Sequence, residues 1–220
     1  MARMKLVLLG LVAVLGISAV ASASAFAECG TGCTRYFVEK TELAGEDKAE
    51  ATVETAQLNS EVAGVKIMIV CTKNKFSEGK IKEKGESSGK IQFEGCKVYE
   101  IKNGVLTLLG NCTVKEPIEF NFKDQLVVGP GGMGEDEFKP SSGTTFVVIK
   151  IEGSLCAIKK EYKTEGSYVA SAGDEGEREL VEHELIFTSN GSKVTFEGKQ
   201  ASFTNRTKIK VEGSKPYYIG

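Results

Sequence analysis

The 220-residue sequence predicts an all-β protein: an antiparallel β-sandwich or barrel-like domain with disulfides, preceded by an N-terminal signal helix. Three observations lead to this prediction. Apolar and polar residues alternate in short runs, which is the pattern of strands with one buried face. Turn sequences recur at intervals of roughly 8 to 12 residues, the spacing of sandwiches and barrels. Six cysteines follow an export signal, which is typical of a disulfide-bonded domain.

The N-terminal residues have the layout of a secretory signal. Arg3 and Lys5 form a basic start, residues 6–20 are apolar or small, and Ala25-Phe26-Ala27 has the A-x-A pattern that signal peptidase cleaves. The apolar run is shorter than the roughly 20 residues of a membrane-spanning helix. We therefore expect residues 1–27 to be a signal peptide and residues 28–220 to form a single β-rich domain with no stable membrane span.

The first strands are predicted at residues 35–40 and 50–55. In the second of these, Ala51, Val53 and Thr55 alternate with polar residues. A helix over residues 42–56 is the alternative, because alanine and glutamate are frequent there. The β-branched residues favour the strand.

The centre of the domain is predicted to consist of three strands, at residues 65–71, 79–84 and 90–96, with a turn at 85–89 before the last of them. Next, Asn103-Gly104 lies between two apolar runs. Both residues tolerate a positive φ, so this pair predicts a tight β-hairpin.

The second half continues with the same alternation of strands and turns. Ile118, Phe120 and Phe122 predict one buried face, and residues 144–151 are expected to form a central strand buried on both faces. Residues 129–137 are glycine-rich and acidic, and we expect an irregular loop there. The remaining strands are predicted at residues 156–163, 168–171, 181–187, 194–196 and 207–211.

The six cysteines are the disulfide candidates Cys29, Cys33, Cys71, Cys96, Cys112 and Cys156. Six cysteines allow 15 connectivities, among which the sequence cannot choose. The expected arrangement has local pairs Cys29–Cys33 and Cys96–Cys112 and a long bridge Cys71–Cys156. Zinc binding is the alternative, but zinc sites use C-x2-C-type pairs or nearby histidines, whereas the nearest cysteines here are Cys29 and Cys33 and the chain has a single histidine.

Several short motifs along the chain suggest that it resembles a group of other proteins. They are ATVET at residues 51–55, VCT at 70–72, FEGC at 93–96, GNCT at 110–113, SGTTF at 142–146 and KIKVE at 208–212. Over residues 49–212 the chain resembles a group of exported, β-rich hypothetical proteins of high-GC Gram-positive bacteria. The resemblance implies an exported β-domain with cysteines at Cys71, Cys96, Cys112 and Cys156, and it supplies no catalytic residues.

No constellation in the sequence indicates a particular reaction. His183, the single histidine, lies between two glutamates on a predicted strand, where we expect it to be half-exposed. The acidic groups at residues 135–137 and 174–177 could offer oxygen ligands to calcium, but they lack EF-hand spacing, so solvated turns are the expectation. We predict no catalytic residues, no metal site and no cofactor.

These observations favour an exported, non-catalytic β-domain with a binding or cell-envelope structural role and an unknown ligand. Its location would be secreted or cell-envelope associated. The signal would remove two of the 28 basic residues and none of the 30 acidic ones, which argues against a nucleic-acid partner. The alternative function is an extracellular hydrolase that uses paired carboxylates. A third possibility is a partner protein that adds a strand to an exposed sheet edge.

Overall fold

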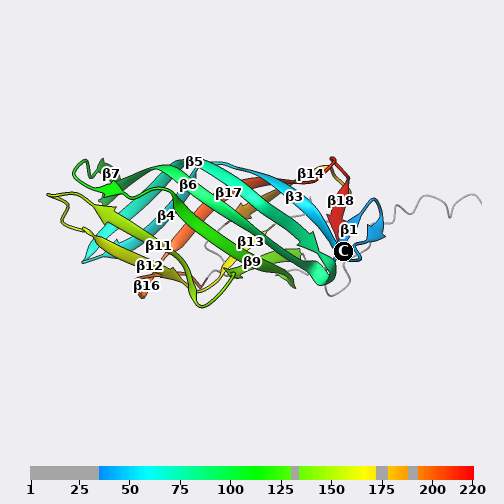
Figure 1. Ribbon diagram of the computed structural model, residues 1–220. Helices are drawn as coiled ribbons and strands as arrows, with labels where there is room; N and C mark the ends of the chain where they lie inside the picture. The colour runs from blue at the N-terminus through cyan, green and yellow to red at the C-terminus, as the bar shows by residue number, and fades with distance from the viewer. Residues whose placement is uncertain (1–34, 130–133, 172–177, 188–192) are drawn as a thin grey trace, which may run out of the picture.

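The computed structural model describes residues 35–129, 134–171, 178–187 and 193–220, and these form an antiparallel all-β structure (Figure 1). The largest sheet contains β3 (Glu46–Val53), β4 (Ala56–Val62), β5 (Val65–Lys82), β6 (Glu86–Lys102), β7 (Val105–Leu108), β9 (Ile118–Val128), β10 (Gly134–Pro140), β13 (Tyr168–Ser171), β14 (Glu182–Phe187) and β17 (Ser202–Val211). A second sheet contains β8 (Thr113–Val114), β11 (Thr145–Glu152), β12 (Lys160–Glu165), β15 (Thr195–Phe196) and β16 (Lys199–Gln200). The third contains β1 (Tyr36–Val38), β2 (Thr41–Glu42) and β18 (Tyr217–Ile219).

A hairpin of β5 and β6 runs most of the length of the molecule (Figure 1). The sequence predicted three strands here, which is wrong, because the structure has two. Residues 65–82 form one 18-residue strand that passes through a register shift between Ser77 and Lys80. The hairpin turns at Glu83–Gly85, where Lys84 and Gly85 both have positive φ, rather than at residues 85–89.

One half of the large sheet closes on itself. The later part of β5 pairs with β6, and the pairing continues through β9, β10, β13, β14 and β17 to β3, which pairs with β5 again. The interior of this closed half is filled by alternate side chains of each strand. In β9, for example, every second residue from Ile118 to Leu126 is buried.

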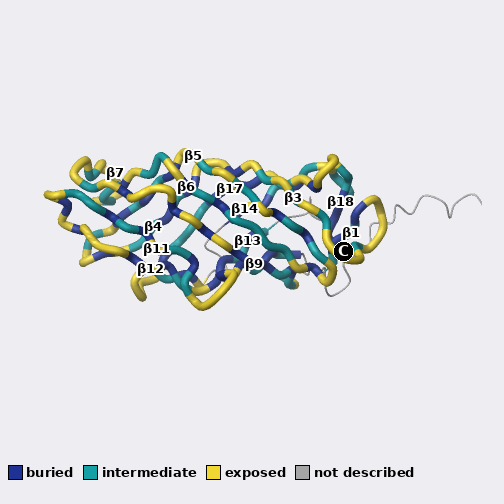
Figure 2. Tube along the Cα trace, in the orientation of Figure 1, coloured by how far each residue is buried: buried dark blue, intermediate teal, exposed yellow. Residues whose placement is uncertain are grey.

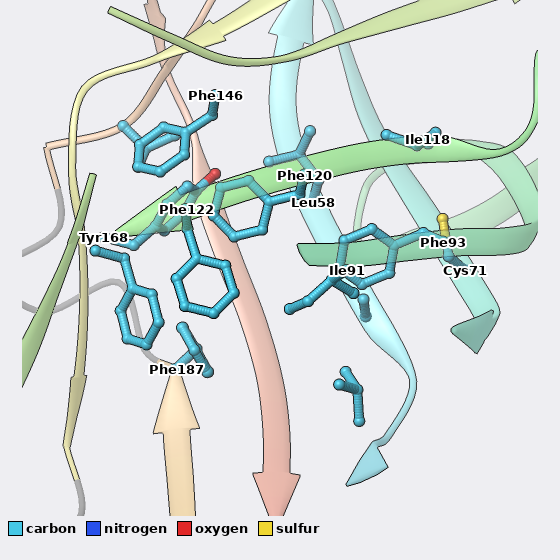
Figure 3. Packing of buried hydrophobic residues seen from close by; sticks show 14 of the residues in the cluster. Leu58, Cys71, Ile91, Phe93, Ile118, Phe120, Phe122, Phe146, Tyr168 and Phe187 are labelled. Atoms are coloured by element: carbon cyan, nitrogen blue, oxygen red, sulfur yellow. The ribbon is translucent and has the colours of Figure 1, made fainter. Parts of the chain in front are cut away.

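The other half of the molecule has two layers. The early part of β5 pairs with β4, and the late part of β6 pairs with β7. The second sheet lies beneath these strands (Figure 1). Phe146 of β11 bridges the two halves, because its ring lies 5.0 Å from Phe120 of β9 and 5.1 Å from Tyr168 of β13 (Figure 3).

The third sheet lies at the end of the closed half. β1 pairs with β18, so the first and last described strands are neighbours. Tyr218 stacks on Phe37 at 4.9 Å, and Tyr36, Tyr217 and Ile219 are buried against the large sheet. This small sheet therefore covers the closed half at the end opposite β7 (Figure 1).

Two local predictions are confirmed and one is wrong. Residues 46–53 form a strand rather than a helix. Asn103 and Gly104 have positive φ and join β6 to β7 in a tight hairpin. Strand β11, in contrast, is not buried on both faces, because Val148 is 46% exposed. The second sheet has no layer on its outer side among the described residues.

The predicted disulfide pairing is wrong for the four cysteines that the structure describes. Cys71 is bonded to Cys96, and Cys112 is bonded to Cys156. The long hairpin explains the first pair, since its register sets Cys71 directly opposite Cys96. The second pair follows from the pairing of β8 with β11, which brings the ends of both strands together. Cys29 and Cys33 lie outside the described residues.

Candidate functional site

Two buried aspartates in the closed half form the most unusual group of the molecule. Asp124 lies on β9 and Asp136 on the neighbouring strand β10. In the register Asp124 faces Phe138 and Asp136 faces Leu126, so both acids lie on the same, inward face, with one residue pair between them. They are 7% and 4% exposed. We call Asp124 and Asp136 the acid pair.

Polar groups from two other strands contact the acid pair. Ser87 of β6 is opposite Asp124, and its hydroxyl and backbone N–H favour the ionised carboxylate, whereas Asp124 Oδ1 is buried with no hydrogen-bond partner among the described residues. The Tyr36 hydroxyl of β1 donates to Asp136 Oδ1 at 3.3 Å. Neither acid forms an ion pair with a lysine or arginine of the described chain.

Burial without a basic partner favours the neutral form of both acids. It raises the pKa of Asp124 to about 7, although the hydrogen bonds from Ser87 act in the opposite direction. Burial also raises the pKa of Asp136 well above its usual range, and the nearby Asp124 adds to this. The pKa of Tyr36 is raised by burial and by the two carboxylates. The acid pair therefore retains protons at a pH where exposed aspartates are ionised.

The acid pair lines a cavity of about 50 Å³ beneath the small sheet of β1 and β18. Its polar lining also includes Ser87, His183 and Tyr217. Ligand pockets are typically about 300 to 1,000 Å³. The cavity is therefore large enough for water molecules but not for a sugar ring or a peptide.

His183 is buried beside this cavity, so the expectation of a half-exposed histidine is wrong. Its side chain is on the inward face of β14 and only 3% exposed. Its Nε2 lies 2.7 Å from the carbonyl oxygen of Tyr217, and the Tyr217 ring meets the imidazole edge-on at 4.3 Å. These contacts join β14 to β18 and hold the small sheet in place.

The structure also corrects the expectation for the acidic loop at residues 129–137. Residues 134–140 form strand β10, and Asp136 faces the interior rather than solvent. Residues 130–133, and the predicted acidic turn at 174–177, lie outside the described residues. Across the described chain, no three histidine, cysteine, aspartate or glutamate side chains are grouped so that they could hold a metal ion.

Alternation along the strands could have revealed the acid pair. Asp124 continues the buried series Ile118, Phe120 and Phe122, and Asp136 precedes Phe138 by two residues. The glycines before Asp136 predicted a loop and concealed this pattern. The pairing of β9 with β10, which brings the two acids together, has no signal in the sequence.

The molecule has larger hollows, but they lie on the surface. One of about 280 Å³ is lined by the exposed glutamates Glu50, Glu78 and Glu212 beside β3 and β5. Another of about 360 Å³, between β4 and β16, contains one acid, Glu61. A second interior cavity of about 60 Å³ is lined almost entirely by apolar side chains. Among these hollows of the described residues, none combines room for a substrate with buried acids.

Comparisons with known proteins add no assignment, because no family model, no curated protein and no solved structure matches the chain. Among the described residues there is no helix of the length and apolarity needed to cross a membrane.

Proposed function

We propose that this protein is an exported, non-catalytic β-domain with a binding or structural role in the cell envelope. One observation carries the proposal: the two acids with raised pKa values line a cavity of only about 50 Å³, which is too small for a sugar ring or a peptide. A catalytic acid must reach the proton that it transfers, so a substrate would have to lie within hydrogen-bond distance. Tyr36, Tyr217 and Ile219 of the small sheet line this cavity.

Export is supported by the disulfides Cys71–Cys96 and Cys112–Cys156, because such bonds persist in oxidising compartments. The signal-like residues 1–27 and the resemblance to exported proteins of high-GC Gram-positive bacteria agree with it. In this proposal the acid pair is a structural group of the closed end, and contacts with other molecules involve the outer surface.

The alternative is an extracellular hydrolase that uses paired carboxylates. The raised pKa of Asp124 favours it, because a general acid must hold its proton near neutral pH. For this activity the small sheet would have to move away from the cavity.

A panel of ester, glycoside and peptide substrates separates the two functions. The purified exported protein should give no turnover above a buffer blank. Turnover that disappears in both Asp124→Asn and Asp136→Asn, while the surface variant Asp47→Asn keeps it, would establish the hydrolase. Sequencing the N-terminus of the exported chain tests export separately, with Glu28 as the expected first residue.

A further inference from the structure

Strand β7 is an edge of the large sheet that the described chain leaves open. It pairs with β6 on one side and is the last strand in the order of the sheet. All four of its residues are exposed, and Val105, Leu106 and Leu108 are 63%, 48% and 50% exposed. Figure 2 shows this exposed end of the molecule, opposite β1 and β18. Open edges in soluble proteins are usually protected by charges or proline, and β7 has neither.

The backbone of β7 presents hydrogen-bonding groups outward at alternate residues. In a two-residue hairpin the pair next to the turn is hydrogen-bonded, so Val105 and Thr107 direct their N–H and C=O groups toward β6. Leu109 continues this set, because its N–H donates to the Val98 carbonyl at 2.9 Å. Leu106 and Leu108 consequently direct their N–H and C=O groups away from the sheet, where a further strand could bind.

The residues around β7 are uncharged and nearly palindromic. Residues 103–111 read NGVLTLLGN, which is symmetric about Thr107 except that Val105 corresponds to Leu109. Lysine, arginine, aspartate and glutamate make up 26% of the chain, yet none occurs in this segment. An antiparallel pair of two such segments would place like residues opposite like residues.

We propose that β7 is a self-association strand, which pairs antiparallel with β7 of a second copy of this chain about a twofold axis at Thr107. In this register Leu106 faces Leu108 of the other copy, and their outward backbone groups exchange hydrogen bonds. Thr107 then faces Thr107 in a non-hydrogen-bonded pair, where the Cα atoms of two strands come within about 4.5 Å. A twofold interface requires such self-complementarity.

The outer face of the sheet supports this register. Cross-strand partners share a face, so Met68, Tyr99 and Leu108 form one apolar row across β5, β6 and β7. Ile101 and Leu106 form the next row. In the dimer Leu108 would lie beside Leu106 of the second copy. The row that ends at Leu108 in one copy would therefore continue into the row that begins at Leu106 in the other. The two sheets would thus share one apolar stripe.

Cysteine substitution tests both the partner and the register. T107C should form a covalent dimer under mild oxidation, seen on non-reducing gels, with a peptide linking the two substituted positions. V105C is the matched control on the same strand face. In the proposed register, residue 105 faces Leu109 of the other copy, which is four residues away from residue 105 of that copy. The two substituted cysteines are therefore far apart, and V105C should form several-fold less covalent dimer. Equal crosslinking of both variants, or none for T107C, would overturn the proposal.

Sedimentation of the unmodified exported chain gives an independent measure. We expect the chain to shift from one copy to two as the protein concentration rises toward about 1 mM. The dimer should be weak, because so short an interface belongs to the small class of transient protein–protein interfaces. Leu108→Pro removes an outward N–H and should abolish the shift, while β6 pairing is retained. Leu155→Lys, at a leucine that is 79% exposed but lies outside β7, should leave it unchanged. A chain that stays monomeric throughout, or a dimer equally weakened by both variants, would contradict the proposal.

The inference is independent of the proposed function, because a hydrolase could dimerise in the same way.

Discussion

At the scale of single residues, the acid pair shows how burial without a countercharge determines protonation. Asp124 and Asp136 interact with Ser87 and Tyr36 but form no ion pair with a lysine or arginine of the described residues. Desolvation therefore outweighs the hydrogen bonds, and the neutral acid is the favoured form. A carboxylate that must lose its proton inside the fold lowers the stability of that fold.

The stability of the protein should consequently fall as the pH rises. The ordinary pKa of an aspartate in an unfolded chain is about 3.9, whereas that of Asp124 in the folded protein is about 7. Between these values the folded state binds the extra proton, so the free energy of unfolding decreases with increasing pH, by at most about 4 kcal/mol for this group. Below this window the stabilisation is complete, and above it the contribution is lost.

Asp124→Asn tests this expectation by removing the titration but keeping the shape of the side chain. Urea unfolding between pH 4 and pH 8 should show that the free energy of unfolding decreases less for the variant than for the natural chain. The variant should therefore be the more stable of the two at pH 8. Part of the decrease remains, because Asp136 also titrates. Asp47→Asn, which alters a carboxylate that pairs with Lys215 outside the cavity, should retain the full decrease. Identical slopes for D124N and the natural chain would refute the explanation.

At the scale of elements, the β5–β6 hairpin depends on close packing at its register shift. Gly79 is buried there, beneath the ring of Phe76 and against the backbone carbonyl of Ala49 in β3. A Cβ atom at this position would overlap both groups. Glycine is therefore required so that β3 can approach β5 closely enough to complete the closed half.

Gly79→Ala should accordingly destabilise the domain by about 1 to 3 kcal/mol, the usual cost of overpacking. Gly110→Ala is the matched control, because a Cβ there meets nothing within 4 Å and its φ is not positive. We expect the control to change stability by less than about 0.5 kcal/mol, as surface substitutions generally do. Urea denaturation of both variants is the measurement. Equal effects would show that the contact with Ala49 has no role in stability.

At the scale of the whole molecule, the two disulfides hold different parts of the chain. Cys71–Cys96 lies within the long hairpin, where backbone pairing already holds the two strands. Cys112–Cys156 joins the segment after β7 to the loop after β11, and so connects the two-layer half across 44 residues of sequence. The loop-closure model gives the longer bridge the larger effect.

The variant C112S/C156S should therefore lose about 4 kcal/mol of stability, and C71S/C96S about 3.5 kcal/mol, from the sequence separations of 44 and 25 residues. Chemical denaturation measures both. Mass spectrometry of non-reduced peptides checks the pairing itself. A peptide that links Cys96 to Cys112 would contradict the structure and restore the pairing predicted from the sequence.

The sequence by itself determined the secondary structure in most places. Alternation identified the buried face of β9, and the Asn103-Gly104 pair identified the hairpin of β6 and β7, since both signals are local and depend only on neighbouring residues. The same alternation contains Asp124, so half of the acid pair was accessible to sequence analysis.

Only the tertiary structure decided which strands are neighbours. The long β5–β6 hairpin sets Cys71 against Cys96, and the pairing of β9 with β10 sets Asp124 beside Asp136. The physical reason is that period-two alternation states which face of a strand is buried but not which strand lies beside it. Partner choice depends on the packing of side chains that are far apart in the sequence, such as Phe120 and Phe146, and on the closure that this packing permits.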